Sequence, residues 1–434
     1  YPLAAAGKYT SIAVSIVRKG SLTSNATPYA DIDFNYFAYG DGSESNPYGI
    51  ATVEQLLNIA LKADKQFELV SSIDMSGIDF ANRLNTYGAI IANTFSGVFD
   101  GNNRSLLGLG NVNISNADVA KFEGFALFKN INNATIKNIN IAETDNNPTK
   151  FVNTFAQKQT NVLKSSLIAM EANNSTLNNV SLSKLTLVFE GNGVLQAATY
   201  IGGLVGVANN TSFEGCISNV EVEFNIDFEP NAGGVYIGGL VAYAQNCKVV
   251  DSAERTTTVA LSVTKTKVIK RFNSIGGVAG YFEGDSVTAE ISGVTATINQ
   301  EVDIYVDHFG GLVGNAVNTN ITNCTVQGNF KHTALETSNI GGIVGQLQGG
   351  TVSNCTITLV FNLTIAVNNK VNVGFVAGYV ASYNQQIATI ENCKINQDFV
   401  NKTKFSADDK SVESMGIYGN SSTTNYQPTG CVKI

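Results

Sequence analysis

Residues that could perform chemistry are few in this chain and lie far apart in its sequence. A glycoside hydrolase needs two or three carboxylates held around the bond that it cleaves. The Asp-Asp pair of this chain, Asp408-Asp409, lies in a lysine-flanked stretch where we expect a solvated loop. The histidines, His308 and His332, belong to no Ser-His-Asp series with a nucleophile elbow. The sequence therefore predicts no catalytic residues and a protein that is not an enzyme.

Oxygen ligands for a metal ion are also poorly arranged. The segment Asp41-Gly42-Ser43-Glu44-Ser45 spells the D-x-S-x-S of a metal-dependent adhesion site, but the buried strand and the distant ligands of such a site are missing. Asp74, Asp79 and Asp100 lack the ligand spacing of a calcium loop. We therefore expect neither a metal nor a cofactor.

The cysteines occupy a repeated position. The chain has six, and in a secreted protein an even number is compatible with disulfides. However, Asn323-Cys324, Asn354-Cys355 and Asn392-Cys393 match Asn138-Ile139, so cysteine stands where an apolar residue is accepted. Because free cysteine packs as a small hydrophobic residue, we expect a ladder of buried thiols, with disulfides as the alternative. The six are Cys216, Cys247, Cys324, Cys355, Cys393 and Cys431.

Composition narrows the class of protein. Of the 434 residues, 14% are charged and the net charge is −8, which argues against a nucleic-acid partner. No apolar run is long enough to cross a bilayer. The start at Tyr1 and the frequent N-x-[ST] triplets favour a secreted or cell-surface protein. The candidate glycosylation sites are Asn25, Asn103, Asn133, Asn210, Asn320, Asn362 and Asn420.

One hexapeptide organises the rest of the chain. Ile201-Gly202-Gly203-Leu204-Val205-Gly206 recurs roughly every 31 to 38 residues, a period typical of solenoids and propellers. Two copies deviate, at Ser165-Ser166 and at Gly416, and serines stand in place of glycines in the first of them. The regular copies begin at Ile201, Ile237, Ile275, Phe309 and Ile340, with a looser copy at Val373.

A second pattern, Thr-x-x-Asn followed by Cys, Ile or Val, accompanies the glycines. Such an asparagine suits a left-handed turn, and its amide can stack between successive coils. Val, Ile, Thr, Asn and Gly dominate, which excludes a helical solenoid, and the repeat is short for a propeller blade. We therefore predict an all-β chain of about nine stacked coils.

Other elements precede the array. Thr52 and Gln55 form a capping box for an amphipathic helix over residues 53–63, which would cover the first coil. Residues 66–70, 73–75 and 94–99 are expected strands. Short strands in residues 12–16 and 32–37 would form an appendage. The predicted organisation is an appendage over residues 1–39 and a solenoid over residues 40–434.

Together, the Gly-Gly-Leu-Val-Gly and Thr-x-x-Asn-Cys segments resemble the GLUG repeat of bacterial and protist surface proteins. The lead-in, from Gly42-Ser43 through Thr52-Val53 to Phe95–Asn102, resembles what precedes such arrays. The resemblance covers about residues 40 to 434 and implies a right-handed parallel β-helix. Such arrays serve adhesins, cell-wall proteins and the non-catalytic portions of large secreted enzymes.

Two functions follow as expectations. The first is a non-catalytic extracellular structural or adhesive protein, whose expected partners are further copies of itself, joined end to end, or a host or cell-surface ligand. The alternative is a carbohydrate-active β-helix enzyme or a glycan-binding module. A groove with a cluster of Asp, Glu, Lys or Arg from neighbouring coils would favour the alternative. Its wall is expected in residues 143–164 or 265–272.

Overall fold

The structure is a computed structural model. It describes residues 36–433 except 77, 79, 116–121, 146–147, 229–232, 266–271, 286–288, 301–305, 335–337, 366–370, 397, 399–403, 407–411, 414–415 and 423–425. The strand predicted over residues 12–16, residues 32–35 of the strand predicted over 32–37, and Asp408-Asp409 lie outside these residues, while Tyr36 and Phe37 are described and are not in a strand.

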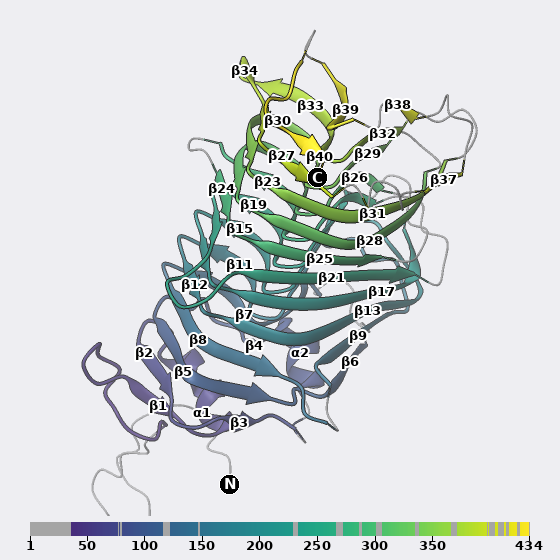
Figure 1. The fold of residues 1–434 in the computed structure, drawn as a ribbon. Coiled ribbons are helices and arrows are strands. Elements are labelled where there is room, and N and C mark those ends of the chain that lie inside the picture. Colours follow the sequence, from purple (N-terminus) through teal and green to yellow (C-terminus); the bar gives the residue numbers. More distant parts are fainter. Residues whose placement is uncertain are drawn as a thin grey trace, which may run out of the picture.

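The described chain winds into a rod of stacked coils (Figure 1). A regular coil holds four strands: β14 (Thr199–Gly202), β15 (Val205–Asn209), β16 (Ser212–Glu214) and β17 (Ile217–Phe228). Each strand pairs in parallel with its counterpart in the next coil, as Tyr200 does with Tyr236 and Val205 with Val241. The predicted parallel β-helix is confirmed. We name the four strand positions walls 1 to 4, in the order of β14 to β17.

The walls contain the following strands. Wall 1 has β10 (Leu163–Ser165), β14, β18 (Val235–Gly238), β22 (Phe272–Gly276), β26 (Val306–Gly310), β29 (Ser338–Gly341), β32 (Val371–Gly374) and β38 (Val412–Glu413). Wall 2 has β4 (Ala89–Ile91), β7 (Gly124–Asn132), β11 (Ala169–Asn173), β15, β19 (Val241–Gln245), β23 (Ala279–Glu283), β33 (Ala377–Tyr383) and β39 (Tyr418–Ser421). β27 (Val313–Thr322) and β30 (Val344–Ser353) run through walls 2 and 3.

Wall 3 also has β1 (Tyr48–Ile50), β2 (Gln66–Leu69), β12 (Thr176–Asn178), β16, β20 (Lys248–Val250), β24 (Ala289–Ser292) and β35 (Thr389–Glu391). β5 (Val98–Leu107) and β8 (Thr135–Ala142) run through walls 3 and 4. Wall 4 continues with β3 (Ile73–Asp74), β6 (Asn111–Ser115), β9 (Lys150–Phe155), β13 (Ser181–Leu195), β17, β21 (Thr258–Lys265), β25 (Thr295–Gln300), β28 (Thr325–Ala334), β31 (Thr356–Ile365), β36 (Lys394–Ile395), β37 (Lys404–Ser406) and β40 (Val432–Lys433). β34 (Gln386–Ile387) pairs antiparallel with β33.

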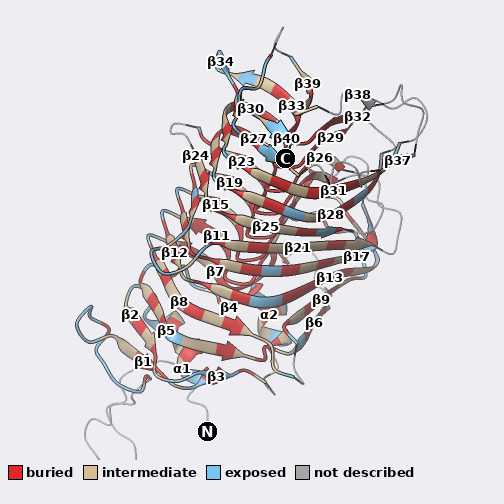
Figure 2. Ribbon diagram, viewed as in Figure 1, coloured by how far each residue is buried: buried red, intermediate tan, exposed pale blue. Residues whose placement is uncertain are grey.

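Inward side chains fill the rod with stacked apolar columns. Buried and accessible residues alternate along the strands, as in β9 (Figure 2). One column joins Phe155, Phe189 and Phe224, with ring centroids 6.4 and 5.4 Å apart in successive coils. Burial of such rings on every coil supplies the hydrophobic stabilisation of the stack.

The first coil is covered by a helix, as predicted. Helix α1 spans Val53–Asn58, and a 3-10 turn continues it over Ile59–Leu61. The hydroxyl of Thr52 accepts a bond from the Gln55 backbone N–H, and the Gln55 side chain accepts one from the N–H of Ala51. The capping box is therefore present, and Val53 and Leu56 are buried.

The sequence predicts one helix, over residues 53–63, and the structure contains a second. Helix α2 spans Ala81–Tyr87 and ends at Gly88, whose φ of 69° lies in the left-handed region. Phe80 and Leu84 are buried, but the helix is too short to show a clear periodic signal in the sequence.

The recurrent asparagines occupy the tight turns. Asn323, Asn354 and Asn392 each precede a buried cysteine and have φ of 56°, 55° and 53°. Gly293 and Gly430 continue this column in neighbouring coils with φ of 78° and 64°. The prediction of left-handed turns is confirmed, because the position accepts only the residues that tolerate this conformation.

Candidate functional site

The Gly-Gly bend between walls 1 and 2 makes the outer surface of the rod concave. Tyr236 and Tyr243 flank one bend, and their rings contact each other at 90° with centroids 6.0 Å apart. Across another bend, the Nδ2 of Asn339 donates to the Oε1 of Gln346 at 3.3 Å. Side chains from the two walls thus meet over the bend. We call this surface the bend groove.

Glycines line the floor of the bend groove and hold the two walls together. A Cβ on Gly280, the third glycine of its repeat, would lie 2.9 Å from both the N of Ile237 and the O of Ser274. The hydroxyl of Ser274 donates to the O of Gly280 at 2.6 Å. Glycine therefore allows the close backbone approach between the two walls.

The groove opens into a pocket of about 470 Å³ at the coil with the deviant repeat copy. Ser165 pairs with Ile201, which places Ser166 at the first glycine position and Leu167 at the second. The expectation of serines at both glycine positions is therefore wrong by one residue. The Ser166 hydroxyl bonds to the O of Ala169 at 2.6 Å, and Met170 takes the place of the third glycine. The pocket is lined by Glu123, Lys129, Asn130, Thr160, Asn161, Val162, Lys164, Met170 and Glu171.

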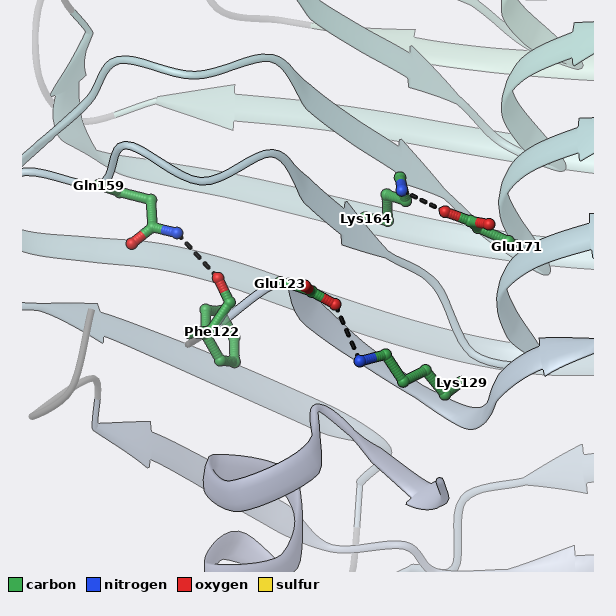
Figure 3. Close-up of polar contacts among 6 residues, drawn as sticks. All are labelled: Phe122, Glu123, Lys129, Gln159, Lys164 and Glu171. Atoms are coloured by element: carbon green, nitrogen blue, oxygen red, sulfur yellow. Dashed lines mark hydrogen bonds and ion pairs between the residues drawn. The ribbon is translucent and has the colours of Figure 1, made fainter. Parts of the chain in front are cut away.

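Four charged side chains from two neighbouring coils meet in this pocket (Figure 3). The Nζ of Lys129 lies 2.9 Å from the Oε2 of Glu123, and Lys164 pairs with the Oε1 of Glu171. All four remain partly accessible, with 26% to 55% of each side chain exposed. They are placed by β7, β10 and β11. The pocket therefore combines two ammonium and two carboxylate groups in charge balance.

One side of the pocket is formed by the segment before β10. Val162 is 41% exposed, and Thr160 and Asn161 flank the opening. The neighbouring Gln159 is buried, and its Nε2 donates to the O of Phe122 at 2.9 Å (Figure 3). This bond ties the segment, and with it this side of the pocket, to the coil below. The expected groove wall in residues 143–164 is thus found, whereas most of residues 265–272 lie outside the described part.

Four tyrosines form the surface of the bend in the coils above the pocket. Tyr200 stacks on Tyr236 with centroids 5.3 Å apart, and Tyr243 stacks on Tyr281 at 4.8 Å. The two stacks stand on opposite walls and contact each other edge to face. All four side chains are half-buried. We call them the tyrosine cluster.

The tyrosine cluster follows the pocket directly, because Lys164 pairs with Tyr200 in the next coil. The Tyr243 hydroxyl donates to the Oε2 of Glu283 at 3.3 Å. Burial, followed by the charges of neighbouring groups, raises the pKa of Tyr281 to about 12. Burial also raises the pKa of Tyr200, Tyr236 and Tyr243. The cluster thus presents neutral phenols at physiological pH.

Amide side chains line the next coils of the groove. The Nδ2 of Asn372 donates to the Oδ1 of Asn339 at 2.6 Å, and Asn339 also lies 3.2 Å from the Nδ1 of His308. His308 thus lies beside the bend, two residues before Gly310. His332 instead is buried in wall 4, where it stacks on Phe330 at 5.7 Å.

The other residues highlighted by the sequence have structural surroundings. Asp41 accepts a bond from the N–H of Ser43 at 2.9 Å and closes the predicted turn. Asp74 accepts in the same way from Ser76. Among the residues that the structure describes, no group of three or more His, Cys, Asp or Glu could hold a metal ion.

All six cysteines are free thiols, and five of them are buried. The predicted ladder of buried thiols is confirmed for Cys324, Cys355 and Cys393, which follow one another in successive coils, with Cys431 as its more accessible end. Cys216 lies in the same column three coils earlier, and Cys247 lies at another corner of the coil, so these two buried thiols are not part of the ladder. The Sγ of Cys393 donates to the O of Val352 and Cys431 accepts from the Cys393 N–H, which ties neighbouring coils together.

The candidate glycosylation sites fall into two groups. Asn103, Asn133 and Asn210 are exposed in left-handed turns, and the Nδ2 of Asn210 already donates to the Oδ1 of Asn174 at 3.2 Å. Asn320, Asn362 and Asn420 lie on strands and are half-buried. Asn25 lies outside the described residues.

Comparison with known families finds the GLUG motif twice, over residues 308–331 and 336–359. The first match begins in β26, the second contains β29, and both contain a Gly-Gly bend. The chain is a GLUG-repeat β-helix protein. A search of curated proteins gave no match. Within the described residues, no helix is sufficiently long and apolar to cross a membrane.

Solved structures provide two further matches. An IgA1 protease is 14% identical with a TM-score of 0.40, over 93% of this chain and 27% of the protease chain. A Bacteroides ovatus protein, described as a proposed immunoglobulin A1 protease, is 18% identical with a TM-score of 0.35, over 89% of this chain and 87% of its own. This GLUG-repeat chain thus spans about a quarter of the first structure.

These matches contradict the prediction that the protein is not an enzyme, since both similar structures are named as proteases. The prediction was based on motifs read along the chain. Stacking of coils brings together Glu123, Lys129, Lys164 and Glu171, which the linear sequence separates. A signal was nevertheless present, because Lys164 and Glu171, like Tyr236 and Tyr243, are seven residues apart across a bend.

Proposed function

We propose that this GLUG-repeat protein is an extracellular, cell-surface adhesin that binds its ligand in the bend groove. The observation that carries this proposal is the pocket at the deviant coil, together with the tyrosine cluster that begins in the next coil. Concave sites that combine aromatic surface with a few convergent polar groups are typical of binding sites. Secretion and glycosylation of Asn103 and Asn133 belong to the same proposal and rest on the sequence.

The stacked architecture suits such a role. Each coil is held by its neighbours above and below through parallel strands, so the groove walls are rigid elements. A rigid groove loses little conformational entropy when it binds, which favours affinity. The bend groove can therefore hold an extended ligand without rearrangement of the rod.

A direct experiment measures adhesion of the whole chain. The protein is applied to immobilised intact mucin, enzymatically deglycosylated mucin and fibronectin, and binding is followed by interferometry. The double variant Lys164→Ala/Glu171→Ala removes one ion pair from the pocket, and Lys248→Ala/Glu290→Ala removes a similar pair from wall 3. We expect the pocket variant to lose at least about tenfold in affinity while the wall 3 variant binds normally. Absence of binding to every surface, or equal binding by both variants, would reject the proposal.

The carboxylates of the pocket favour a second candidate function, in which the bound polymer is also cleaved. Glu123 and Glu171 are side chains of the type that glycosidases use in pairs. Incubation with polysaccharides and analysis of the released ends would detect turnover. Loss of turnover in Glu171→Gln, with binding retained, would support this candidate.

End-to-end self-association remains a separate prediction. Ile387 and Val432, in the last described coils, are 52% and 47% exposed. Sedimentation over a range of concentrations tests it, and a monomer at every concentration would exclude it.

A further inference from the structure

The structure gives the bend groove a chemistry that selects among ligands. Resting on the proposed function, we infer that its ligand is a neutral polysaccharide, which lies along the rod from the pocket across the tyrosine cluster. The inference rests on three observations: the pocket and the tyrosine cluster lie in adjacent coils, their side chains are amphipathic, and their charges are paired.

Continuity along the rod favours a polymer. Lys164, Tyr200 and Tyr236 follow one another on wall 1 in adjacent coils, and Glu171, Val207 and Tyr243 do so on wall 2. Adjacent coils are about 4.8 Å apart. Walls 1 and 2 therefore offer one set of contacts per coil, at a spacing close to the size of one sugar ring. An extended chain of linked sugar rings can use these contacts in succession.

The tyrosine cluster matches the surface of a sugar ring. A pyranose has apolar C–H faces and a rim of hydroxyls, and tyrosine combines an apolar ring with a polar tip. Tyr200 stacks on Tyr236 with one face, and its other face is turned toward the coil of Lys164 and the pocket. The apolar surface of the ring thus borders the polar groups of the pocket, as recognition of an amphipathic ring requires.

The backbone of the groove argues against an extended peptide as the ligand. Peptides that bind to sheets commonly add a strand to an exposed edge. The strands β10, β14, β11 and β15 are each paired on both sides by neighbouring coils, so they present no free edge. Recognition in the groove must therefore come from side chains.

The charges argue for a neutral ligand. Lys129 and Lys164 are each paired with a glutamate inside the pocket, and the chain as a whole has a net charge of −8. A nucleic acid or a strongly acidic polysaccharide would need unpaired cations. Hydroxyl-rich, uncharged chains can instead hydrogen-bond to ammonium and carboxylate groups together.

The test measures binding of the whole chain to defined probes by calorimetry. The probes are neutral oligosaccharides of mannan, galactan and cellulose type, together with oligogalacturonate and fibronectin. The variants are Tyr236→Ala, Tyr236→Phe and, as a control outside the groove, Lys248→Ala, with the fold of each checked by circular dichroism. We expect a neutral oligosaccharide to bind, Tyr236→Ala to weaken it at least about tenfold, Tyr236→Phe to weaken it less because the apolar ring is kept, and Lys248→Ala to stay within about threefold.

Four results would overturn the inference. Saccharide binding that Tyr236→Ala leaves unchanged would place the ligand elsewhere. Preference for oligogalacturonate would show that the groove binds an acidic ligand. Binding to fibronectin alone, with loss of that binding in Tyr236→Ala, would show that it binds a protein. In both cases the inference would fail and the proposed function would stand. Failure of every probe to bind, including the mucins and fibronectin used for adhesion, would reject both.

Discussion

Tyr243 and Tyr281 stack in register on wall 2, with an interplanar angle of 2° between their rings. Tyr236 stands at 90° to both from wall 1. The tyrosine cluster therefore joins the two walls of the bend groove as well as successive coils. Its aromatic contacts should contribute to the stability of the rod.

Replacement of Tyr243 by alanine is expected to lower the free energy of unfolding by about 2 kcal/mol, because it removes a half-buried ring and its aromatic contacts. Tyr243→Phe, which keeps the ring, should cost less than about 1 kcal/mol despite losing the bond to Glu283. Urea denaturation of the two variants measures the difference. Equal costs would show that the hydroxyl, rather than the stacked ring, stabilises the cluster.

The second and third glycines of a repeat should respond differently to alanine. A Cβ on Gly203 would lie 2.1 Å from the backbone O of Gly239, so Gly203→Ala is expected to cost about 3 kcal/mol. At Gly206 the nearest atom is the O of Met170 at 2.8 Å, and the next coil already carries Ala242 at this position. Gly206→Ala should therefore cost less than Gly203→Ala, about 1 to 2 kcal/mol. Thermal unfolding compares the two, and a reversed order would contradict the assigned close approaches.

The left-handed turn before Cys355 gives a third prediction. Asn354→Ala should destabilise the protein by about 1 to 2 kcal/mol, since alanine disfavours a φ of 55°. Asn354→Gly should be nearly neutral, because Gly293 and Gly430 occupy equivalent turns. Chemical denaturation tests this pair of variants. A glycine variant as unstable as the alanine variant would assign the stabilisation to the asparagine amide instead.

The buried thiols predict a dependence of stability on pH. Burial raises the pKa of Cys216 and of Cys247 to about 12. The folded state therefore favours the neutral thiol, and this contribution to stability is full below the thiol's ordinary pKa, near pH 8.5. It declines as pH rises from there toward pH 12. Denaturation at pH 8 and at pH 10.5 should show lower stability at the higher pH, and a rise would contradict the burial of these thiols.

Reactivity of the same thiols provides the control for that titration. In the native protein at pH 8, Cys431 should react with a thiol reagent first, because it is the accessible end of the ladder. The other five should react only after unfolding. Mass spectrometry of the labelled peptides identifies the order.

The repeated part of the fold could be predicted from the sequence because each coil uses the same residues for the same physical reason. Glycine at Gly203 permits close backbone approach, asparagine at Asn354 adopts the left-handed turn, and Cys355 fills an inward apolar position. Repetition makes such local requirements visible. The short helix α2 occurs once, and Leu167 replaces the repeat glycine in only one coil. Features that occur once give no periodic signal.

The groove was harder to predict, since it depends on which outward residues meet across a bend. Lys164 and Glu171 are ordinary surface residues until the coil brings them together, and the contact of Lys129 with Glu123 belongs to the coil below. Outward residues seven apart across each Gly-Gly pair were the available signal. Charge pairing and pocket volume depend on side-chain positions that no motif specifies.

A crystal structure of the whole chain, determined after soaking with a neutral oligosaccharide, tests the central claim most directly. The account predicts sugar rings in the bend groove, with one ring in the pocket beside Lys164 and Glu171 and another over Tyr200. Oligosaccharide bound on wall 3 or wall 4, with the bend groove occupied only by solvent, would contradict it.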